Sequence, residues 1–250
     1  MPALPVGVRA PMKYCDLTLA TPEENLACDE ALLELCEAGS LEPVLRFWEP
    51  SSYFVVLGYA NPVATEVNLE FCRTQAIPVL RRCTGGGTVL QGPGCLNYSL
   101  ILPLEMESAL HSIPNTNRFV LNKHQVALST LLRTHIELQG HTDLALGGLK
   151  FSGNSQRRRK NALLFHGSFL LNFEIGLIEK ALPMPSKQPD YRLRRSHSDF
   201  LLNLKTSSQL VKTALLNAWN ATASWVEIPS GQIALLVNEK YAVGEWNFKF

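Results

Sequence analysis

The residues best suited to chemistry are three successive glycines, Gly85-Gly86-Gly87, which follow the pair Arg81-Arg82. Glycine carries no Cβ, so its backbone can adopt positive φ and approach a ligand closely. Backbone N–H groups freed in this way can form a donor array that suits phosphate or carboxylate oxygens, and arginines add charge and fork-shaped donors. The run indicates either an anion cradle or a hairpin turn with solvated arginines. Because no Gly-Lys-Ser/Thr follows, it is not a P-loop, and it does not match the dinucleotide fingerprint.

A second candidate is Lys150, which precedes Ser152-Gly153-Asn154 in an apolar, strand-like stretch. A partly buried ammonium needs a partner, and a bound carboxylate or phosphate would supply one. The alternative is an edge-strand lysine whose charge discourages sheet pairing. Taken alone, the residue favours the structural edge-strand lysine.

Three further features are ambiguous. Arg46 alternates with apolar neighbours, so it could point into a cleft or lie on the sheet surface. His166, beside Gly167, could line a pocket or be a core histidine with its hydrogen bonds satisfied. The basic run 157–160 has no interleaved aromatic residues, which is more typical of a hairpin tip than of a nucleic-acid site.

Composition narrows the class of protein. The chain has 250 residues, of which 46% are hydrophobic and 18% charged, with a formal net charge of +1. A chain of this length and hydrophobic content predicts a single domain over residues 1–250, with a loose tail at 1–13. The near-zero net charge gives no overall electrostatic attraction to nucleic acid or acidic membranes. No apolar run approaches the roughly 20 residues that span a bilayer, and the start does not resemble a signal peptide. Six cysteines without a Cys-x-x-Cys pair indicate reduced thiols and a cytoplasmic location.

The predicted elements are grouped strands with helices between the groups. A helix starts at Thr21-Pro22, where Thr21 caps and Glu24 completes a capping box, and Asp29 and Glu30 are expected on its solvated face. The hairpin-like strand pairs predict an α+β fold with a mixed, mostly antiparallel sheet and flanking helices. The other expected segments are strands at 44–48, 53–58, 77–80, 96–102, 145–152 and 162–173, helices at 69–75, about 117–138, 208–223 and 232–241, a basic connector at 154–161 and an irregular stretch at 182–200.

Four motifs then occur in a fixed order, and together they resemble the signature of the lipoate–protein ligase family, within the biotin/lipoate protein ligase and octanoyltransferase superfamily. Their order and spacing over about 90 residues make the resemblance specific. The segments Arg46-Phe47-Trp48 and Trp246-Asn247-Phe248 are similar to the borders of the family's catalytic domain, so nearly the whole chain is covered. The motifs are Arg81-Arg82-x-Thr84-Gly85-Gly86-Gly87-x-Val89, Gly94-x-Leu96-Asn97-Tyr98-Ser99, Lys150-x-Ser152-Gly153-Asn154-x-Gln156 and His166-Gly167-Ser168.

The resemblance implies a fold like the biotin/lipoate ligase catalytic domain and a reaction in two steps. The carboxylate of lipoate or octanoate attacks the α-phosphorus of ATP, with Mg²⁺ as cofactor, to give an acyl-adenylate and pyrophosphate. A lysine on a lipoyl carrier domain then takes the acyl group as an amide. The carrier would be of the 2-oxoacid dehydrogenase E2 or glycine cleavage H protein type.

The resemblance also assigns residues to the site. Lys150 would neutralise charge in both steps, and Asp143 would help to hold magnesium or the lysine. The residues implied in binding substrate or cofactor are Arg46, Arg81, Arg82, Thr84, Gly85, Gly86, Gly87, Thr88, Val89, Asn97, Ser152, Gly153, Asn154, His166 and Gly167.

Departures from the family pattern leave alternatives open. Family members often have histidine where this chain has Gln91. The octanoyltransferase relatives use a cysteine nucleophile, but the corresponding stretches, 141–144 and 172–186, contain none. This favours adenylation, although Cys83 and Cys95 near the glycines leave a thioester route open, and a non-catalytic binding homologue is a third possibility. The chain ends at the border of the catalytic domain, so we expect it to lack the accessory domain of many ligases and to need a separate accessory polypeptide or to perform transfer only.

Overall fold

The structure is a computed structural model that describes residues 12–250. Residues 1–11, most of the expected loose tail, lie outside the described part. Met12 and Lys13 begin a strand, and Met12 is buried in the core, so the expectation of a loose tail is wrong for these two residues.

The described residues form a sheet of eight strands and a smaller sheet of three. In the large sheet the order is β11-β1-β2-β6-β10-β9-β8-β7, and only the β11–β1 and β1–β2 pairs are parallel. The small sheet has the order β4-β3-β5. The strands are β1 (Met12–Asp16), β2 (Val44–Trp48), β3 (Phe54–Leu57), β4 (Val79–Arg81), β5 (Val89–Gln91), β6 (Cys95–Pro103), β7 (Glu137–Gln139), β8 (Asp143–Leu146), β9 (Leu149–Arg158), β10 (Ala162–Leu170) and β11 (Ala221–Ser224).

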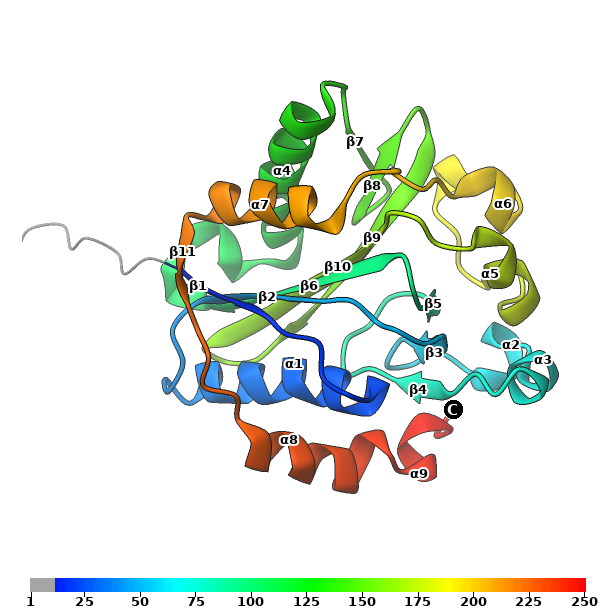
Figure 1. Cartoon of the computed structure of the whole chain (residues 1–250), viewed down its shortest axis with the longest axis horizontal. Coiled ribbons are helices and arrows are strands. Elements are labelled where there is room, and N and C mark those ends of the chain that lie inside the picture. The colour runs from blue at the N-terminus through cyan, green and yellow to red at the C-terminus, as the bar shows by residue number, and fades with distance from the viewer. Residues whose placement is uncertain (1–11) are drawn as a thin grey trace, which may run out of the picture.

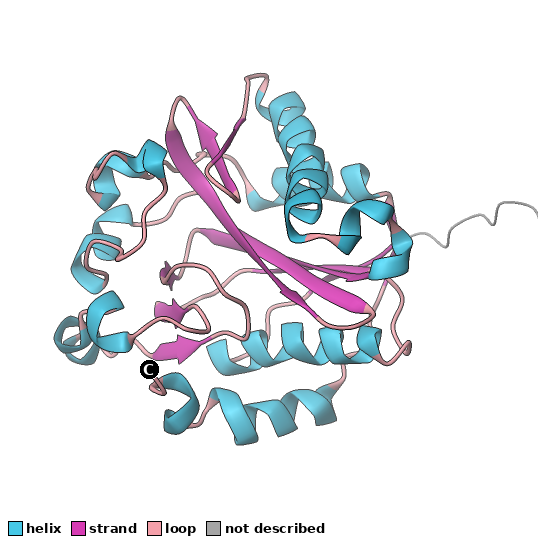
Figure 2. Ribbon diagram, turned by 180° about the vertical axis from the view of Figure 1, so that it is seen from behind, coloured by secondary structure: helices cyan, strands magenta, loops and turns pink. Residues whose placement is uncertain are grey.

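Helices cover both faces of the large sheet, so the predicted α+β fold with a mixed, mostly antiparallel sheet is confirmed. Helices α4 and α7 pack on one face, and α1 with α8 behind it packs on the other (Figure 1, Figure 2). No helix within residues 12–250 combines the length and apolar character that crossing a membrane requires. The helices are α1 (Pro22–Glu37), α2 (Val63–Glu66), α3 (Leu69–Thr74), α4 (Ile113–Leu132), α5 (Ile175–Ala181), α6 (His197–Phe200), α7 (Ser208–Trp219), α8 (Ser230–Leu236) and α9 (Gly244–Asn247), with 3₁₀ turns η1 (Leu104–Met106), η2 (Ser108–His111) and η3 (Asp190–Arg192) and the π-turn η4 (Val237–Tyr241).

Several element boundaries differ from the sequence prediction. The basic stretch expected to be a connector is mostly strand, because β9 runs to Arg158 and only 159–161 form the turn into β10. The strand expected at 145–152 is the hairpin of β8 and β9, which turns at Gly147-Gly148, both with positive φ. Positive φ is the backbone conformation that glycine adopts at least cost.

Two helices end earlier than predicted because a residue at the end takes a left-handed conformation. Helix α4 starts at Ile113, capped by Ser112, and ends at Leu132, because the next residue, Arg133, has a φ of 53°; residues 137–139 then form β7. Helix α7 ends at Asn220 with φ of 49°, and the residues that follow form β11. Left-handed residues commonly end helices, and periodicity alone does not reveal them.

The face of the first helix predicted to be solvated is in fact buried. Asp29 and Glu30 are each 3% exposed, because α1 lies between the large sheet and the C-terminal helices. Asp29 pairs with Arg46 from β2, and Glu30 accepts from Lys240 and from the hydroxyl of Tyr241. Buried carboxylates of this kind need such partners to offset the cost of desolvation.

Candidate functional site

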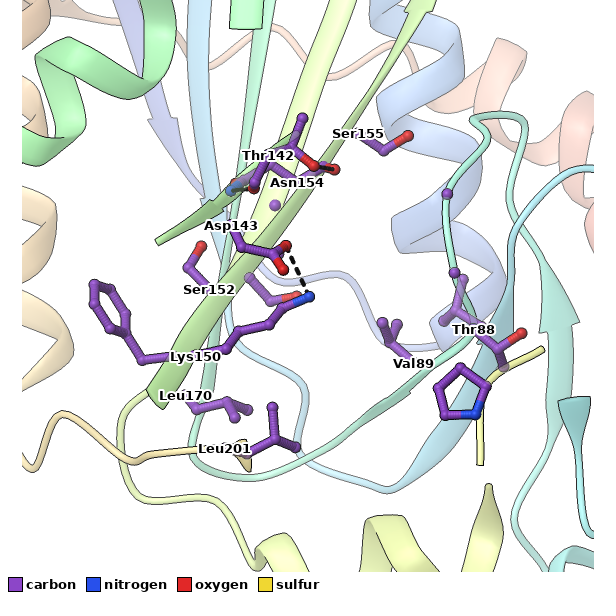
Figure 3. A pocket seen from close by; sticks show the side chains of 18 of the residues that line it. Thr88, Val89, Thr142, Asp143, Lys150, Ser152, Asn154, Ser155, Leu170 and Leu201 are labelled. Carbon is purple, nitrogen blue, oxygen red and sulfur yellow. Dashed lines mark hydrogen bonds and ion pairs between the residues drawn. The ribbon is translucent and has the colours of Figure 1, made fainter. Parts of the chain in front are cut away.

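A cavity of about 840 Å³ lies between the large sheet and the loop that joins β4 to β5. Residues Gly86, Gly87, Thr88 and Val89 of that loop line one side, and Lys150 lines the other. Figure 3 shows the lysine extending from β9 into the space in front of Thr88 and Val89. The structure therefore brings the two most informative sequence features to one cavity, which is within the size range of small-molecule sites.

Lys150 faces the cavity because β9 contains a bulge. Ala145 pairs with Lys150, whereas Leu144 pairs with Ser152, so Phe151 is an extra residue. A bulge shifts the alternation of side chains along a strand. Phe151 joins the apolar core, and Lys150 lies over Gly153, where a Cβ would approach Nζ to 2.8 Å. Any side chain larger than hydrogen at position 153 would therefore displace the lysine.

The ammonium of Lys150 is held by an acidic partner within the cavity. Its Nζ lies 2.8 Å from Oδ1 of Asp143, as the dashed line in Figure 3 marks. The other oxygen, Oδ2, accepts a hydrogen bond of 2.8 Å from the hydroxyl of Tyr191. Burial, followed by the negative charge of Asp143, raises the pKa of Tyr191, so the phenol stays protonated and donates. The lysine is 27% exposed and reachable by a ligand.

Asn154 and Gly167 support this group from the opposite face of the sheet. The Asn154 amide accepts from the hydroxyl of Tyr98 at 2.6 Å and donates to the carbonyl of Thr142 at 2.7 Å. The Thr142 hydroxyl returns a bond to the carbonyl of Asn154. A Cβ at Gly167 would lie 1.8 Å from Oδ1 of Asn154, so only glycine fits there. These contacts fix the position of Thr142 and thereby orient the next residue, Asp143, which pairs with Lys150.

The glycine loop, residues 82–88 between β4 and β5, is held by Arg82 on the side away from the cavity. Its guanidinium is buried and donates to the carbonyls of Val56, Gly85 and Gly87. A trans peptide points its N–H opposite to its C=O, so the amides of Gly86 and Thr88 point away from Arg82, on the side that lines the cavity. Within residues 12–250 neither amide donates a hydrogen bond. Arg82 therefore leaves two free donors on the cavity side instead of presenting its own.

Arg81 and Arg46 are placed in the protein interior and do not line the cavity. Arg81 is fully buried and donates to the carbonyls of Gly58, Tyr59, Asn61, Trp246 and Asn247. Arg46 is fully buried and pairs with Asp29 at 2.6 Å, with further bonds to Asn25 and Leu17. Both guanidinium groups hold chain segments together, so their predicted contact with a ligand has no support in this geometry.

Thr84 and His166 meet beneath the loop. Thr84 is fully buried, and its Oγ1 lies 2.7 Å from Nε2 of His166 and 2.9 Å from Nε of Arg82. Burial, and next the charge of Arg82, lowers the pKa of His166 well below its ordinary value. The imidazole is therefore neutral at physiological pH and unsuited to bind an anion by charge.

The remaining predicted residues also lie at the cavity. Asn97 and Ser152 line it, and Asn97 donates to Gln91, which donates to Ser168. The Ser152 hydroxyl is buried and has no hydrogen-bond partner among the described residues, and its register opposite Leu144 and Phe169 turns it toward the core face, so its predicted contact with a ligand has no support in this geometry. Sequence reasoning missed the stretch from Leu182 to Arg192, including Tyr191, which covers one side of the cavity. This stretch shows no hydrophobic periodicity and no recognised motif, so nothing in its sequence indicates a site.

A family model described as the lipoyl protein ligase A/B catalytic domain matches residues 21–217. The chain belongs to this family. It is therefore an enzyme of the lipoate ligase and octanoyltransferase type, as the four motifs predict.

Similar proteins of this family carry two different names. An octanoyltransferase LipM of Brevibacillus brevis is 24% identical, with 95% of this chain and 98% of that protein covered. Subunit 1 of lipoate-protein ligase A from Thermoplasma acidophilum is 26% identical over 92% and 95% of the two chains. These names cover both the adenylating and the acyl-transferring branch.

Solved structures of lipoate–protein ligases share the fold. The ligase chain of a bi-partite lipoate protein ligase from Thermoplasma acidophilum superposes with a TM-score of 0.79, at 24% identity, covering 95% of this chain and 96% of that one. A lipoate-protein ligase A bound with ATP gives a TM-score of 0.77 at 25% identity, with 96% and 99% covered. These likenesses confirm the predicted catalytic-domain fold.

A family enzyme that works through a thioester needs an accessible thiolate, and the cysteines do not provide one. All six are free and buried. Cys95 lines the cavity, but burial raises its pKa to about 12, and burial, followed by Glu30, does the same for Cys83. The region where one branch of the family has its cysteine holds Thr142, whose hydroxyl is bonded to Asn154.

The predicted magnesium site at Asp143 is a poor fit to the residues present. Both oxygens of Asp143 already face Lys150 and Tyr191. Within residues 12–250 no three His, Cys, Asp or Glu side chains are grouped so that they could hold a metal ion. The carboxylate of Asp143 is therefore better suited to hold Lys150 than to bind a metal ion.

Proposed function

We propose that this enzyme attaches lipoate, or octanoate, to a lysine of a lipoyl carrier domain through an acyl-adenylate formed from ATP. The observation that carries the proposal is the placement of Lys150 opposite the free amides of Gly86 and Thr88 across one cavity. An ammonium and backbone donors on two sides suit a ligand with a carboxylate next to phosphate oxygens.

The proposed reaction needs positioning and charge stabilisation more than covalent help from the protein. In the first step a carboxylate oxygen attacks the α-phosphorus, and the bond to the bridging oxygen breaks with release of pyrophosphate. In the second step a neutral carrier amine attacks the acyl carbonyl, loses a proton and displaces AMP. Lys150 would neutralise the carboxylate and α-phosphate, and the loop amides would hold the phosphate oxygens.

Two further observations support adenylation over a thioester route. The thiols nearest the loop, Cys83 and Cys95, are buried and protonated at physiological pH. Similar structures include a lipoate-protein ligase A bound with ATP and a lipoate protein ligase with bound lipoic acid. The Thermoplasma structure is of a bi-partite ligase and its E2 lipoyl domain, which supports a lipoyl carrier domain and a separate accessory polypeptide as partners here too.

The test is pyrophosphate release by the purified protein with lipoate, octanoate and biotin in parallel, followed by mass spectrometry of an added lipoyl domain. We expect release with lipoate or octanoate, a mass increase of one acyl group on the carrier, and loss of both in Lys150→Ala. The assay is run with and without an accessory subunit of the bi-partite type, because adenylation could require it.

The opposite result is equally clear. A covalent octanoyl adduct on Cys83 or Cys95 after incubation with an octanoyl carrier protein, without ATP, would assign the protein to the transferase branch. Binding of a lipoylated domain without either reaction would make it a binding protein.

A further inference from the structure

Buried polar groups lie between helix α1 and the glycine loop, and those from His166 through Thr84 to Arg82 are joined by hydrogen bonds. Asp29, on α1, is 3% exposed, and its Oδ2 accepts from the hydroxyl of Ser99 at 2.6 Å and lies 3.9 Å from Nδ1 of His166. The other ring nitrogen, Nε2, lies 2.7 Å from the hydroxyl of Thr84. That hydroxyl accepts from Nε of Arg82 at 2.9 Å.

One assignment of donors and acceptors uses the Thr84 hydroxyl proton and places the proton of His166 on the side of Asp29. Arg82 can only donate, so its Nε–H occupies one lone pair of the Thr84 oxygen and the hydroxyl proton remains available. Neutral His166 can accept that proton at Nε2 if its own proton is on Nδ1, on the side of Asp29.

The chain ends on the group that shapes the loop. Arg82 turns the carbonyls of Gly85 and Gly87 inward, which leaves the amides of Gly86 and Thr88 on the cavity side. Without Thr84, Nε of Arg82 would keep only its longer bond of 3.1 Å to the carbonyl of Gly85. The guanidinium is buried, so water is a poor substitute for the lost acceptor.

We propose that His166 is a positioning residue that acts through Thr84 to hold Arg82 beneath the glycine loop, and so keeps the loop amides aimed at the phosphate end of the substrate. The inference rests on the proposed function for the identity of that ligand. Asp29 faces Nδ1 of His166 at 3.9 Å without a hydrogen bond and is itself held by Arg46 at 2.6 Å. His166 also lines the cavity, so direct contact with substrate is the competing role that the experiment must separate.

The first measurement does not depend on catalysis. The Nε proton of Arg82, identified in ¹H–¹⁵N spectra by its loss in Arg82→Lys, should exchange slowly in the wild-type protein. In Thr84→Val, which keeps the shape and removes the hydroxyl, we expect exchange to be about 10-fold or more faster. Thr84→Ser restores the hydroxyl and should restore slow exchange, and Thr116→Val, another fully buried threonine, is the matched control. Unchanged exchange in Thr84→Val would overturn the proposal.

The second measurement is a double-variant cycle on ATP-dependent pyrophosphate release. We expect Thr84→Val and His166→Asn each to lower kcat/KM for ATP by about 10- to 100-fold, and the double variant to be no worse than either alone, because both break one chain. His166→Gln, whose amide oxygen reaches near the place of Nε2, should recover most of the activity. Multiplied losses in the double variant would mean that His166 acts on the substrate itself and would overturn the proposal.

The two measurements keep this inference separate from the proposed function. If Arg82 loosens in Thr84→Val and His166→Asn but the wild-type protein releases no pyrophosphate with any acid, the adenylation proposal fails and the positioning role stands. If pyrophosphate release is normal in both single variants, the positioning role fails and adenylation stands.

Discussion

The two faces of the large sheet differ in chemistry although the same strands form both. On β6, Leu96, Tyr98, Leu100 and Leu102 pack toward α4 and α7 in the main apolar core. The residues between them, Asn97 and Ser99, face α1 and the cavity and make side-chain hydrogen bonds. Strand β10 repeats the pattern, with Phe165 and Phe169 on the core face and His166 and Ser168 on the cavity face.

The difference shows how one strand can contribute to stability and to a site at once. Side chains alternate across a sheet, so a motif such as His166-Gly167-Ser168 places its first and last residues in the cavity and its glycine on the packed face. Lys150 departs from this rule, because the bulge at Phe151 moves it to the cavity face. The comparison predicts that changes on the cavity face affect turnover, whereas changes on the core face affect stability.

The largest expected effect is on the cavity face. Replacing Lys150 by Ala removes the cation that we place between carboxylate and phosphate, and should lower kcat/KM for pyrophosphate release by about 10³-fold. The free energy of unfolding should fall by only about 1 kcal/mol, because the buried carboxylate of Asp143 loses its cation but keeps the Tyr191 bond. Steady-state kinetics and urea unfolding of the same preparation measure both. Lys13→Ala, a surface lysine paired with Glu42, is the control, and activity within tenfold of wild type would contradict the assigned role.

The reverse is expected on the core face. Phe165 is fully buried in the core, one residue before His166. Phe165→Ala should lower the free energy of unfolding by about 3 to 5 kcal/mol, from lost burial and the cavity left behind. Activity per folded molecule should stay near wild type at low temperature. Phe248→Ala, at a residue 52% exposed, should shift stability by less than about 0.5 kcal/mol. A loss of activity in correctly folded Phe165→Ala would contradict the prediction that the core face affects stability and not turnover.

Much of this arrangement could be predicted from local sequence. The capping box at Thr21 fixes the start of α1 because it depends only on neighbouring residues, and the apolar runs locate most strands. The glycine loop and Lys150 were ambiguous on their own and could be assigned to the site only because they fall in four motifs with a fixed order and spacing.

What the sequence could not predict depends on contacts between distant segments. Arg46 and Arg81 have the residue type of anion ligands, but their partners come from α1 and from the C-terminal residues, so their burial follows from tertiary packing. Asp29 appeared to lie on a solvated helix face for the same reason. Tyr191 reaches Asp143 from an irregular segment 48 residues away, and no periodic pattern marks such a residue.

The free energy of unfolding should also depend on pH through a histidine on the core face. His124, on α4, is fully buried and accepts from the indole of Trp219, and burial, followed by the charge of Lys123, lowers its pKa from 6.5 to about 3. The folded protein therefore binds this proton less readily than the unfolded chain, so stability is retained above pH 6.5 and lost as pH falls below it. The loss should reach about 2 kcal/mol between pH 7 and pH 5.

Urea unfolding at several pH values tests this expectation. His124→Gln keeps an acceptor for Trp219 but does not titrate, so its stability should fall less steeply than that of the wild-type protein over the same range. Equal slopes in the two proteins would mean that other groups carry the acid sensitivity. Pyrophosphate release at pH 7 should be the same in both, because His124 lies on the face away from the cavity.

The smallest expected effect concerns a residue that belongs to neither face. Tyr191 comes from the segment that covers the cavity, and its hydroxyl donates to Asp143 beside Lys150. Tyr191→Phe removes one hydrogen bond to a charged acceptor, so we expect kcat/KM to fall by about fivefold, which corresponds to about 1 kcal/mol, with unchanged stability of the sheet. Tyr14→Phe, which packs against the apolar core, is the control. A loss above a hundredfold would place Tyr191 in the reaction itself, and no loss at all would mean that Lys150 is positioned by the sheet alone.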